Sequence, residues 1–125
     1  MVKSFITVLV SFAILIGGAI YEQIYLKNTF NELHDSFSAI NEKIIDENAT
    51  ADDILGLQSL WIEKKEKLHA FIPHNDIKEV DLWVAEAVYY AKDKDFTEAR
   101  AKISVVIELF EQIPKTFLIK FENIF

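Results

Sequence analysis

The sequence predicts an all-α protein, with an N-terminal transmembrane helix followed by an antiparallel up-down helical bundle of about four helices. One observation is an uncharged run of eighteen residues near the amino terminus. A second is that apolar residues recur at steps of three and four through the remaining chain, as on one face of a helix. A third is that only 3 Gly and 2 Pro occur in 125 residues, so the connections must be short. Short connections between amphipathic helices favour antiparallel neighbours.

Residues 4–21, with the sequence SFITVLVSFAILIGGAIY, form the predicted span. As a helix this run is about 27 Å long, close to the thickness of a bilayer's hydrocarbon core. A cleaved secretory signal is the alternative, because Lys3 gives a positive start and Gly17 and Ala19 are small residues suited to cleavage. The run exceeds the roughly 7–15 apolar residues of a signal peptide. We therefore expect an uncleaved anchor.

Charge predicts the topology of the chain. Lys3 precedes the span, and Glu22 is the first charged residue after it. The positive-inside rule then keeps residues 1–3 in the cytoplasm and places residues 22–125 outside it. The predicted organisation is a cytoplasmic start (1–3), a transmembrane anchor or uncleaved signal (4–21) and an extracytoplasmic helical bundle (22–125). The expected location is the cell membrane, crossed once.

The first bundle helix is expected to continue outward from the span, because no Gly or Pro occurs between residues 19 and 55. Its apolar positions step by four and three and end before Asp46-Glu47-Asn48. This hydrophobic seam comprises Leu26, Phe30, Leu33, Phe37, Ile40 and Ile44. The seam can face the protein's own bundle or a second copy in a homodimer. We favour the first, because the other helices also need a partner face.

The second helix is expected to begin after Thr50, which forms a capping-box pattern with Asp53. Pro73 is expected to end this helix, because the residue before a proline avoids helical geometry. The residues of its buried face, interrupted by Lys64, are Ile54, Leu57, Trp61, Leu68 and Phe71.

Two further helices follow. Caps for the third are sought among His74, Asn75 and Asp76, and a charged turn at residues 92–95 leads to an Asp95–Glu98 cap for the fourth. Pro114 is expected to kink or restart the fourth helix. The predicted core positions are Ile77, Val80, Val84, Ala87 and Ala91 in the third helix, Phe96, Ala99, Ile103, Val106, Phe110 and Ile113 in the fourth, and Phe117, Phe121 and Ile124 in the tail.

Composition argues against several functions. The chain after residue 21 carries 12 Lys and Arg against 20 Asp and Glu, so nucleic acid is not an expected partner. Cysteine is absent, which removes thiol catalysis and cysteine-bound zinc. Glu66 and His69 have the spacing of one half of a di-iron site, but no second copy follows. We expect no catalytic residue, metal site or cofactor, and we expect that the protein is not an enzyme.

Four aromatic residues, Trp61, Trp83, Tyr89 and Tyr90, are the candidate partner-binding set, because Trp and Tyr often anchor protein interfaces. Tyr89 and Tyr90 are adjacent on a helix, so one must point away from the core. The expected function is a membrane-anchored, extracytoplasmic interaction or scaffold domain that contacts lipid through its span and binds a protein partner. The alternative is a ligand-binding sensory module that acts through a partner.

Several short motifs carry a resemblance to a known family. They are Trp61-x-x-Lys64-Lys65, Phe71-Ile72-Pro73-His74, Asp95-Phe96-x-Glu98-Ala99 and a closing Asn123-Ile124-Phe125. With the hydrophobic start, the chain resembles a family of short, single-span membrane proteins of unknown function from spore-forming Gram-positive bacteria. The resemblance implies an anchored helical domain outside the cytosol. It implies no activity, ligand or catalytic residue.

Overall fold

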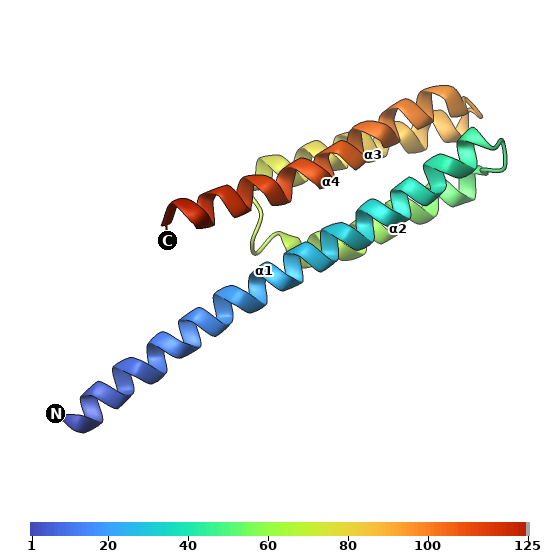
Figure 1. Cartoon of the computed structure of the whole chain (residues 1–125). Coiled ribbons are helices and arrows are strands. Elements are labelled where there is room, and N and C mark those ends of the chain that lie inside the picture. The colour runs from blue at the N-terminus through green and yellow to red at the C-terminus, as the bar shows by residue number, and fades with distance from the viewer. Residues whose placement is uncertain (125) are drawn as a thin grey trace.

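The computed structural model describes the backbone of residues 1–124 and the side chains of residues 1–116. It contains four helices, α1 (Val2–Ile45), α2 (Ala51–Leu68), α3 (His74–Lys92) and α4 (Phe96–Ile124), and no strand occurs within residues 1–124. Consecutive helices turn back on one another (Figure 1). The predicted all-α, up-down architecture is confirmed.

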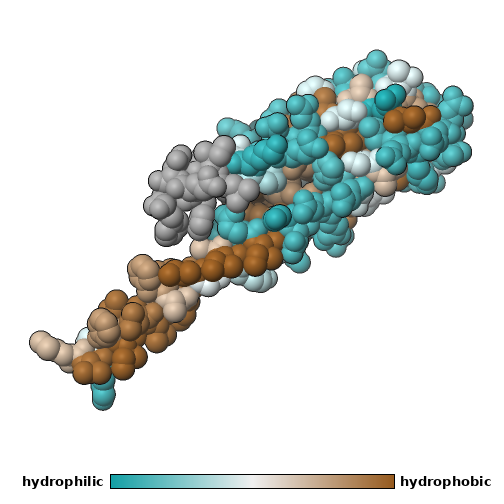
Figure 2. Space-filling model, viewed as in Figure 1, coloured by the Kyte–Doolittle hydropathy of each residue, from teal (hydrophilic) through white to brown (hydrophobic). Residues whose placement is uncertain are grey.

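Helix α1 is one continuous helix of 44 residues. Its amino-terminal part projects from the bundle as an isolated rod (Figure 1), and none of its most apolar eighteen-residue window is buried. Figure 2 shows this rod as a hydrophobic surface next to a largely hydrophilic bundle. The rod is long and apolar enough to cross a membrane, as an anchor helix or a signal sequence would.

The carboxy-terminal part of α1 packs its hydrophobic seam into the chain's own bundle. Five seam residues are buried and Ile40 is partly buried. The helix ends at Ile45, and Glu47 then adopts a φ of 60°, in the left-handed region that terminates a helix. The prediction that the apolar run continues without a break into the first bundle helix is confirmed.

The four helices form a ring of antiparallel neighbours. Helix α1 contacts α2 and α4, and α3 contacts the same two helices. The turns at residues 46–50 and 93–95 therefore lie at the end of the bundle far from the rod, and the turn at residues 69–73 lies at the near end (Figure 1). Helix α4 runs back toward the rod.

The predicted helix caps have mixed outcomes. The capping box is confirmed, because the Thr50 N–H donates to Asp53 Oδ2 at 2.9 Å and the Asp53 N–H donates to Thr50 Oγ1 at 3.3 Å. The Asp95 cap is also confirmed, because Asp95 Oδ1 accepts from the Glu98 N–H at 3.2 Å.

The predicted junction between α2 and α3 is wrong in two respects. Helix α2 ends at Leu68 rather than beside Pro73, because the N–H groups of Phe71 and Ile72 both turn back to the Leu68 carbonyl. His74 does not cap α3, because Pro73 occupies the cap position and no side chain bonds there. Proline forces Ile72 away from helical geometry, so the chain needs several residues to turn.

Helix α4 continues through Pro114, so of the two predicted outcomes, a kink or a restart of the helix, the restart is wrong. Proline removes the N–H that would bond to the Phe110 carbonyl, yet Phe110 and Ile113, which directly precede it, are buried and hold this part of the helix against the bundle. The predicted face of Phe117, Phe121 and Ile124 lies outside the described side chains.

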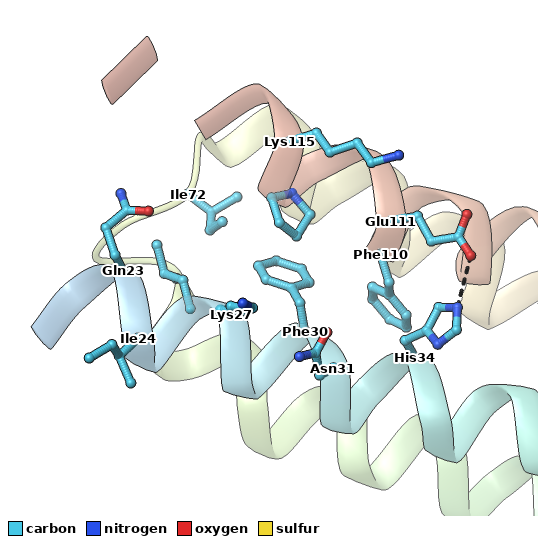
Figure 3. A pocket seen from close by; sticks show the side chains of 12 residues that line it. Gln23, Ile24, Lys27, Phe30, Asn31, His34, Ile72, Phe110, Glu111 and Lys115 are labelled. Carbon is cyan, nitrogen blue, oxygen red and sulfur yellow. Dashed lines mark hydrogen bonds and ion pairs between the residues drawn. The ribbon is translucent and has the colours of Figure 1, made fainter. Parts of the chain in front are cut away.

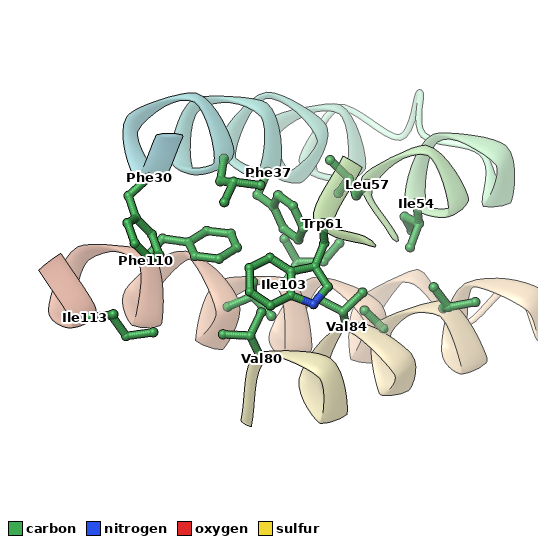
Figure 4. Close-up of a cluster of buried hydrophobic side chains, with 14 of the residues drawn as sticks. Phe30, Phe37, Ile54, Leu57, Trp61, Val80, Val84, Ile103, Phe110 and Ile113 are labelled. Atoms are coloured by element: carbon green, nitrogen blue, oxygen red, sulfur yellow. The ribbon is translucent and has the colours of Figure 1, made fainter. Parts of the chain in front are cut away.

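The core is centred on an aromatic cluster. Trp61, Phe30, Phe37 and Phe110 are among its largest fully buried side chains (Figure 4). The Phe110 ring lies 5.0 Å from Phe37 in an edge-on arrangement, 5.8 Å from Trp61 and 6.1 Å from Phe30, measured between ring centroids. Phe110 of α4 thereby joins α1 and α2 across the interior of the bundle.

Candidate functional site

Trp61 lies inside the core with 1% of its surface exposed. Its indole Nε1 donates to Asp81 Oδ1 of α3 at 2.6 Å, and Lys65 Nζ contacts both oxygens of the same carboxylate at 3.1 and 3.2 Å. Trp61 therefore joins α2 to α3 and is not accessible to a partner while the bundle is folded.

The other three aromatic candidates lie on α3 and face outward to different degrees. Tyr89 is 63% exposed, whereas Trp83 and Tyr90 are half-buried. The prediction that one of the adjacent tyrosines points away from the core is confirmed. Leu82, two helical turns before Tyr89, is exposed as well, at 58%. We call Leu82, Trp83, Tyr89 and Tyr90 the α3 aromatic surface.

A lysine from the neighbouring helix orders this surface. Lys102 Nζ of α4 lies 5.3 Å from the Trp83 ring and 5.8 Å from the Tyr90 ring, within the range of cation–π attraction. The same ammonium lies 3.7 Å from Glu86 Oε2. The Tyr89 and Tyr90 rings meet edge-on at 5.4 Å. The surface is thus held in place by contacts between α3 and α4.

A cavity of about 530 Å³ opens between α1 and α4 at the near end of the bundle (Figure 3). Leu26, Phe30, Ile72, Phe110 and Pro114 form its apolar floor. Polar side chains stand around the opening, and they are Gln23, Lys27, Asn31, His34, Glu111 and Lys115. Most of the exposed lining is apolar, as is usual for sites that bind small molecules.

An ion pair spans the edge of this cavity. His34 Nε2 of α1 lies 2.9 Å from Glu111 Oε1 of α4 (dashed in Figure 3), and His34 Nδ1 lies 3.3 Å from Asp35 Oδ1. The hydrogen bond to Glu111, aided by Asp35, raises the pKa of His34 above its ordinary value of 6.5, against the opposing effect of burial. This pair joins α1 to α4.

Each of the four helix interfaces carries such an ion pair. Glu32 and Lys64 join α1 to α2 at 3.1 Å, Asp81 and Lys65 join α2 to α3 at 3.1 Å, and Glu86 and Lys102 join α3 to α4 at 3.7 Å. Within the side chains of residues 1–116, only the α1–α4 interface uses a histidine as the cation of its pair. That interface is therefore the one whose pair changes charge near neutral pH.

The remaining histidines lie in and beside the α2–α3 turn. The rings of His69 and His74 stack at 5.8 Å. Across the described part of the chain, no group of three His, Asp or Glu side chains is arranged to hold a metal ion.

Sequence reasoning did not find the cavity or its ion pair. The two principal walls of the cavity belong to α1 and α4, and the buried face of each of these helices was predicted. The polar lining, such as Lys27, Asn31 and His34, is spaced by four and three beside the buried stripe of α1. That spacing could have indicated a polar edge along α1. It could not have indicated the partner of His34, because Glu111 is 77 residues away in the sequence.

Comparison with known proteins identifies a family. No curated protein and no solved structure matches the chain. One family model, DUF4363, described as a domain of unknown function, matches residues 20–124. The match begins in the last residues of the predicted span and covers the bundle part of α1 and the whole of α2, α3 and α4. The chain therefore belongs to the DUF4363 family.

Proposed function

We propose that this protein is a non-enzymatic, membrane-anchored interaction domain, held outside the cytoplasm by its N-terminal helix and bound to another protein through the α3 aromatic surface. In this proposal the chain is a short protein that crosses the membrane once. It would then be like the single-span proteins of spore-forming Gram-positive bacteria that its motifs resemble. The observation that carries the binding proposal is the pairing of two large exposed side chains, Leu82 and Tyr89, with two half-buried aromatic rings on one helix.

The arrangement of α3 supports a role in binding. Exposed apolar residues that occur singly are ordinary, but a group on one helix face is typical of an interface. Lys102 and Glu86 order the neighbouring Trp83 and Tyr90 rings, so little side-chain entropy remains to be lost on binding. Tyr and Trp are also the residues that most often dominate binding energy.

The continuity of α1 supports anchoring. A helix that passes from the apolar rod into the core without interruption holds the bundle close to the bilayer surface. Helix α3 runs lengthwise in the same bundle as α1 (Figure 1), so the α3 aromatic surface on its side would face along the membrane plane rather than toward the bilayer. A partner anchored in the same membrane could reach it.

Site-specific photo-crosslinking in cells tests this function. A photoreactive phenylalanine analogue at position 89 should yield one discrete adduct, whereas the same analogue at Ile62, 47% exposed on α2, should yield none. With the adduct partner purified, the double change Leu82→Ala and Tyr89→Ala should weaken binding at least about tenfold, which corresponds to roughly 1.4 kcal/mol.

The control and the contrary results are defined by the same variants. Ile62→Ala should leave the affinity unchanged. Equal adducts from both positions, or unchanged affinity in the double variant, would contradict the proposal. An adduct of twice the chain's mass would instead identify the partner as a second copy, and the α3 aromatic surface would then be a homodimer interface.

Ligand sensing through a partner is the second candidate function, and the cavity between α1 and α4 favours it. Its size lies in the range of roughly 300–1,000 Å³ found for small-molecule sites. A ligand there would bridge the anchoring helix to α4.

A further inference from the structure

We propose that the cavity between α1 and α4 binds an anionic phospholipid from the surrounding membrane leaflet. One acyl chain would lie against the apolar floor, and the phosphate would lie between Lys27 and Lys115. This inference rests on the membrane anchoring proposed above and is independent of the α3 aromatic surface.

The floor of the cavity suits a hydrocarbon chain. Phe30, Phe110 and Ile72 are each less than 5% exposed and come from α1, α4 and the α2–α3 turn. Apolar cavities bind apolar groups in preference to ordered water, because water would lose hydrogen bonds there. The opening is flanked by polar groups, so a chain could enter while its headgroup stays in water.

The position of the cavity suits a lipid. Lys27 follows Tyr21, the last residue of the predicted span, by six residues, or about 9 Å along the helix. The headgroup layer adds roughly 5–8 Å to each side of the hydrocarbon core. Ile20 and Ile24 are 53% and 55% exposed, and Ile24 lines the cavity. They form an apolar path along α1 from the span into the cavity.

The charge around the opening suits an anion. Lys27 on α1 and Lys115 on α4 stand on the two sides of the cavity (Figure 3). Among the side chains of residues 1–116, no carboxylate lies in ion-pair distance of either lysine, and Glu111 is engaged by His34. Because the chain carries a net charge of −7, general attraction to anionic lipid is not expected. Selection of an anionic headgroup would have to come from these two ammonium groups.

Photo-crosslinking of the full chain in lipid nanodiscs tests the inference. The nanodiscs would contain phosphatidylcholine with a small fraction of phosphatidylglycerol that carries a diazirine at the end of one acyl chain. Mass spectrometry should find crosslinks in the span and, separately, in peptides containing Phe30 or Phe110. The same diazirine on phosphatidylcholine should label the span equally and the cavity peptides at least about fivefold less.

Two double variants give the matched comparison. Lys27→Gln with Lys115→Gln should reduce labelling of the cavity peptides by phosphatidylglycerol at least about fivefold without changing labelling of the span. Lys92→Gln with Lys94→Gln removes two exposed lysines at the far end of the bundle and should change neither. Circular dichroism of all variants should match the parent, so that a loss of labelling reports binding rather than unfolding.

Each contrary result has a distinct meaning. Labelling of the span without the cavity would overturn the inference and leave the anchor intact, whereas an unlabelled span would overturn the anchoring itself. Equal cavity labelling by both lipids, or in the Lys27→Gln and Lys115→Gln variant, would overturn the selection of an anionic headgroup. Displacement of the probe by oleate but not by unlabelled phosphatidylglycerol would assign the cavity to a free fatty acid and overturn the phospholipid.

Discussion

Asp81 is the residue whose role is least visible in the sequence and most explicit in the structure. It is a charged residue on a mostly apolar helix, and it accepts hydrogen bonds from the buried Trp61 indole and from Lys65. An indole N–H that loses its acceptor inside a core keeps its desolvation cost without compensation. Asp81 therefore determines whether Trp61 can stay buried.

Replacing Asp81 with Ala should lower the free energy of unfolding by about 1–3 kcal/mol. Urea unfolding of the full chain in detergent, followed by tryptophan fluorescence, would measure this. Glu79→Ala, an exposed change on the same helix, should stay within about 0.5 kcal/mol of the parent. In a Trp61→Phe background the Asp81→Ala effect should shrink, because the donor is gone. An undiminished effect there would mean that Asp81 stabilises the fold mainly through Lys65.

His34 should make the stability of the bundle depend on pH. Its folded-state pKa is raised by Glu111 and Asp35, so its stabilisation is complete below pH 6.5 and is lost as the pH rises through the folded-state pKa. Other charged groups around it, Lys27 on its own helix and Lys115 on α4, line the same cavity.

The expected result is that the difference in unfolding free energy between the parent and His34→Gln is larger at pH 5.5 than at pH 8. The other histidines are common to both proteins and cancel in this difference. Urea titrations at the two pH values measure it. A difference that is constant with pH, or larger at pH 8, would show that the His34–Glu111 pair does not form as the charged pair described.

Residue pairs of this kind could not be predicted from the sequence. The hydrogen bond of Trp61 to Asp81 depends on how α2 and α3 are rotated about their own axes, and periodicity fixes each helix face only to within about one residue position. Trp61 was considered for binding because of its residue type, although its place on the apolar face of α2 already indicated burial. For Tyr89 and Tyr90 the sequence indicated only that two adjacent helical residues cannot both face the core, and it did not indicate which of the two is exposed.

At the scale of helices, the buried faces could be predicted from the sequence, whereas the residues at which the helices end were harder to predict. The seam of α1 and the faces of α3 and α4 follow the three- and four-residue steps that a helix requires, and the structure buries nearly all of them. Pro73 and Pro114 show the limit. The position of a proline shows which backbone N–H is missing. Whether the helix ends before the proline, as α2 does at Leu68, or continues through it, as α4 does, depends on packing.

Phe110 tests whether the helices form one cooperative core. Its ring contacts Phe30, Phe37 and Trp61, and it is 2% exposed. Phe110→Ala should therefore lower the free energy of unfolding by about 3–5 kcal/mol in the same urea titration. Phe96→Ala, at a half-buried position on the same helix, should lower it less. A loss below about 1 kcal/mol for Phe110→Ala would mean that this ring does not join the helices.

At the scale of the whole molecule, α1 serves two structures at once. The apolar window in its first half is not buried by the bundle. Its second half supplies one of the four walls of the core. Removal of the first half should therefore leave the core intact. The stability of the bundle cannot distinguish an anchor from a signal sequence, and only the covalent state of the chain in cells can.

An uncleaved anchor predicts that the full-length mass is found in the membrane fraction and is not released by high salt. Protease added to wall-free cells should then digest the bundle, because the charge asymmetry around the span predicts a location outside the cytoplasm. A signal sequence predicts instead a salt-soluble product that begins near Ile20. Protection of the bundle from protease in intact cells, with digestion after lysis, would show the reverse topology. The anchored result would also retain Ile20 and Ile24 beside the bilayer, which is the arrangement that access of a lipid chain to the cavity requires.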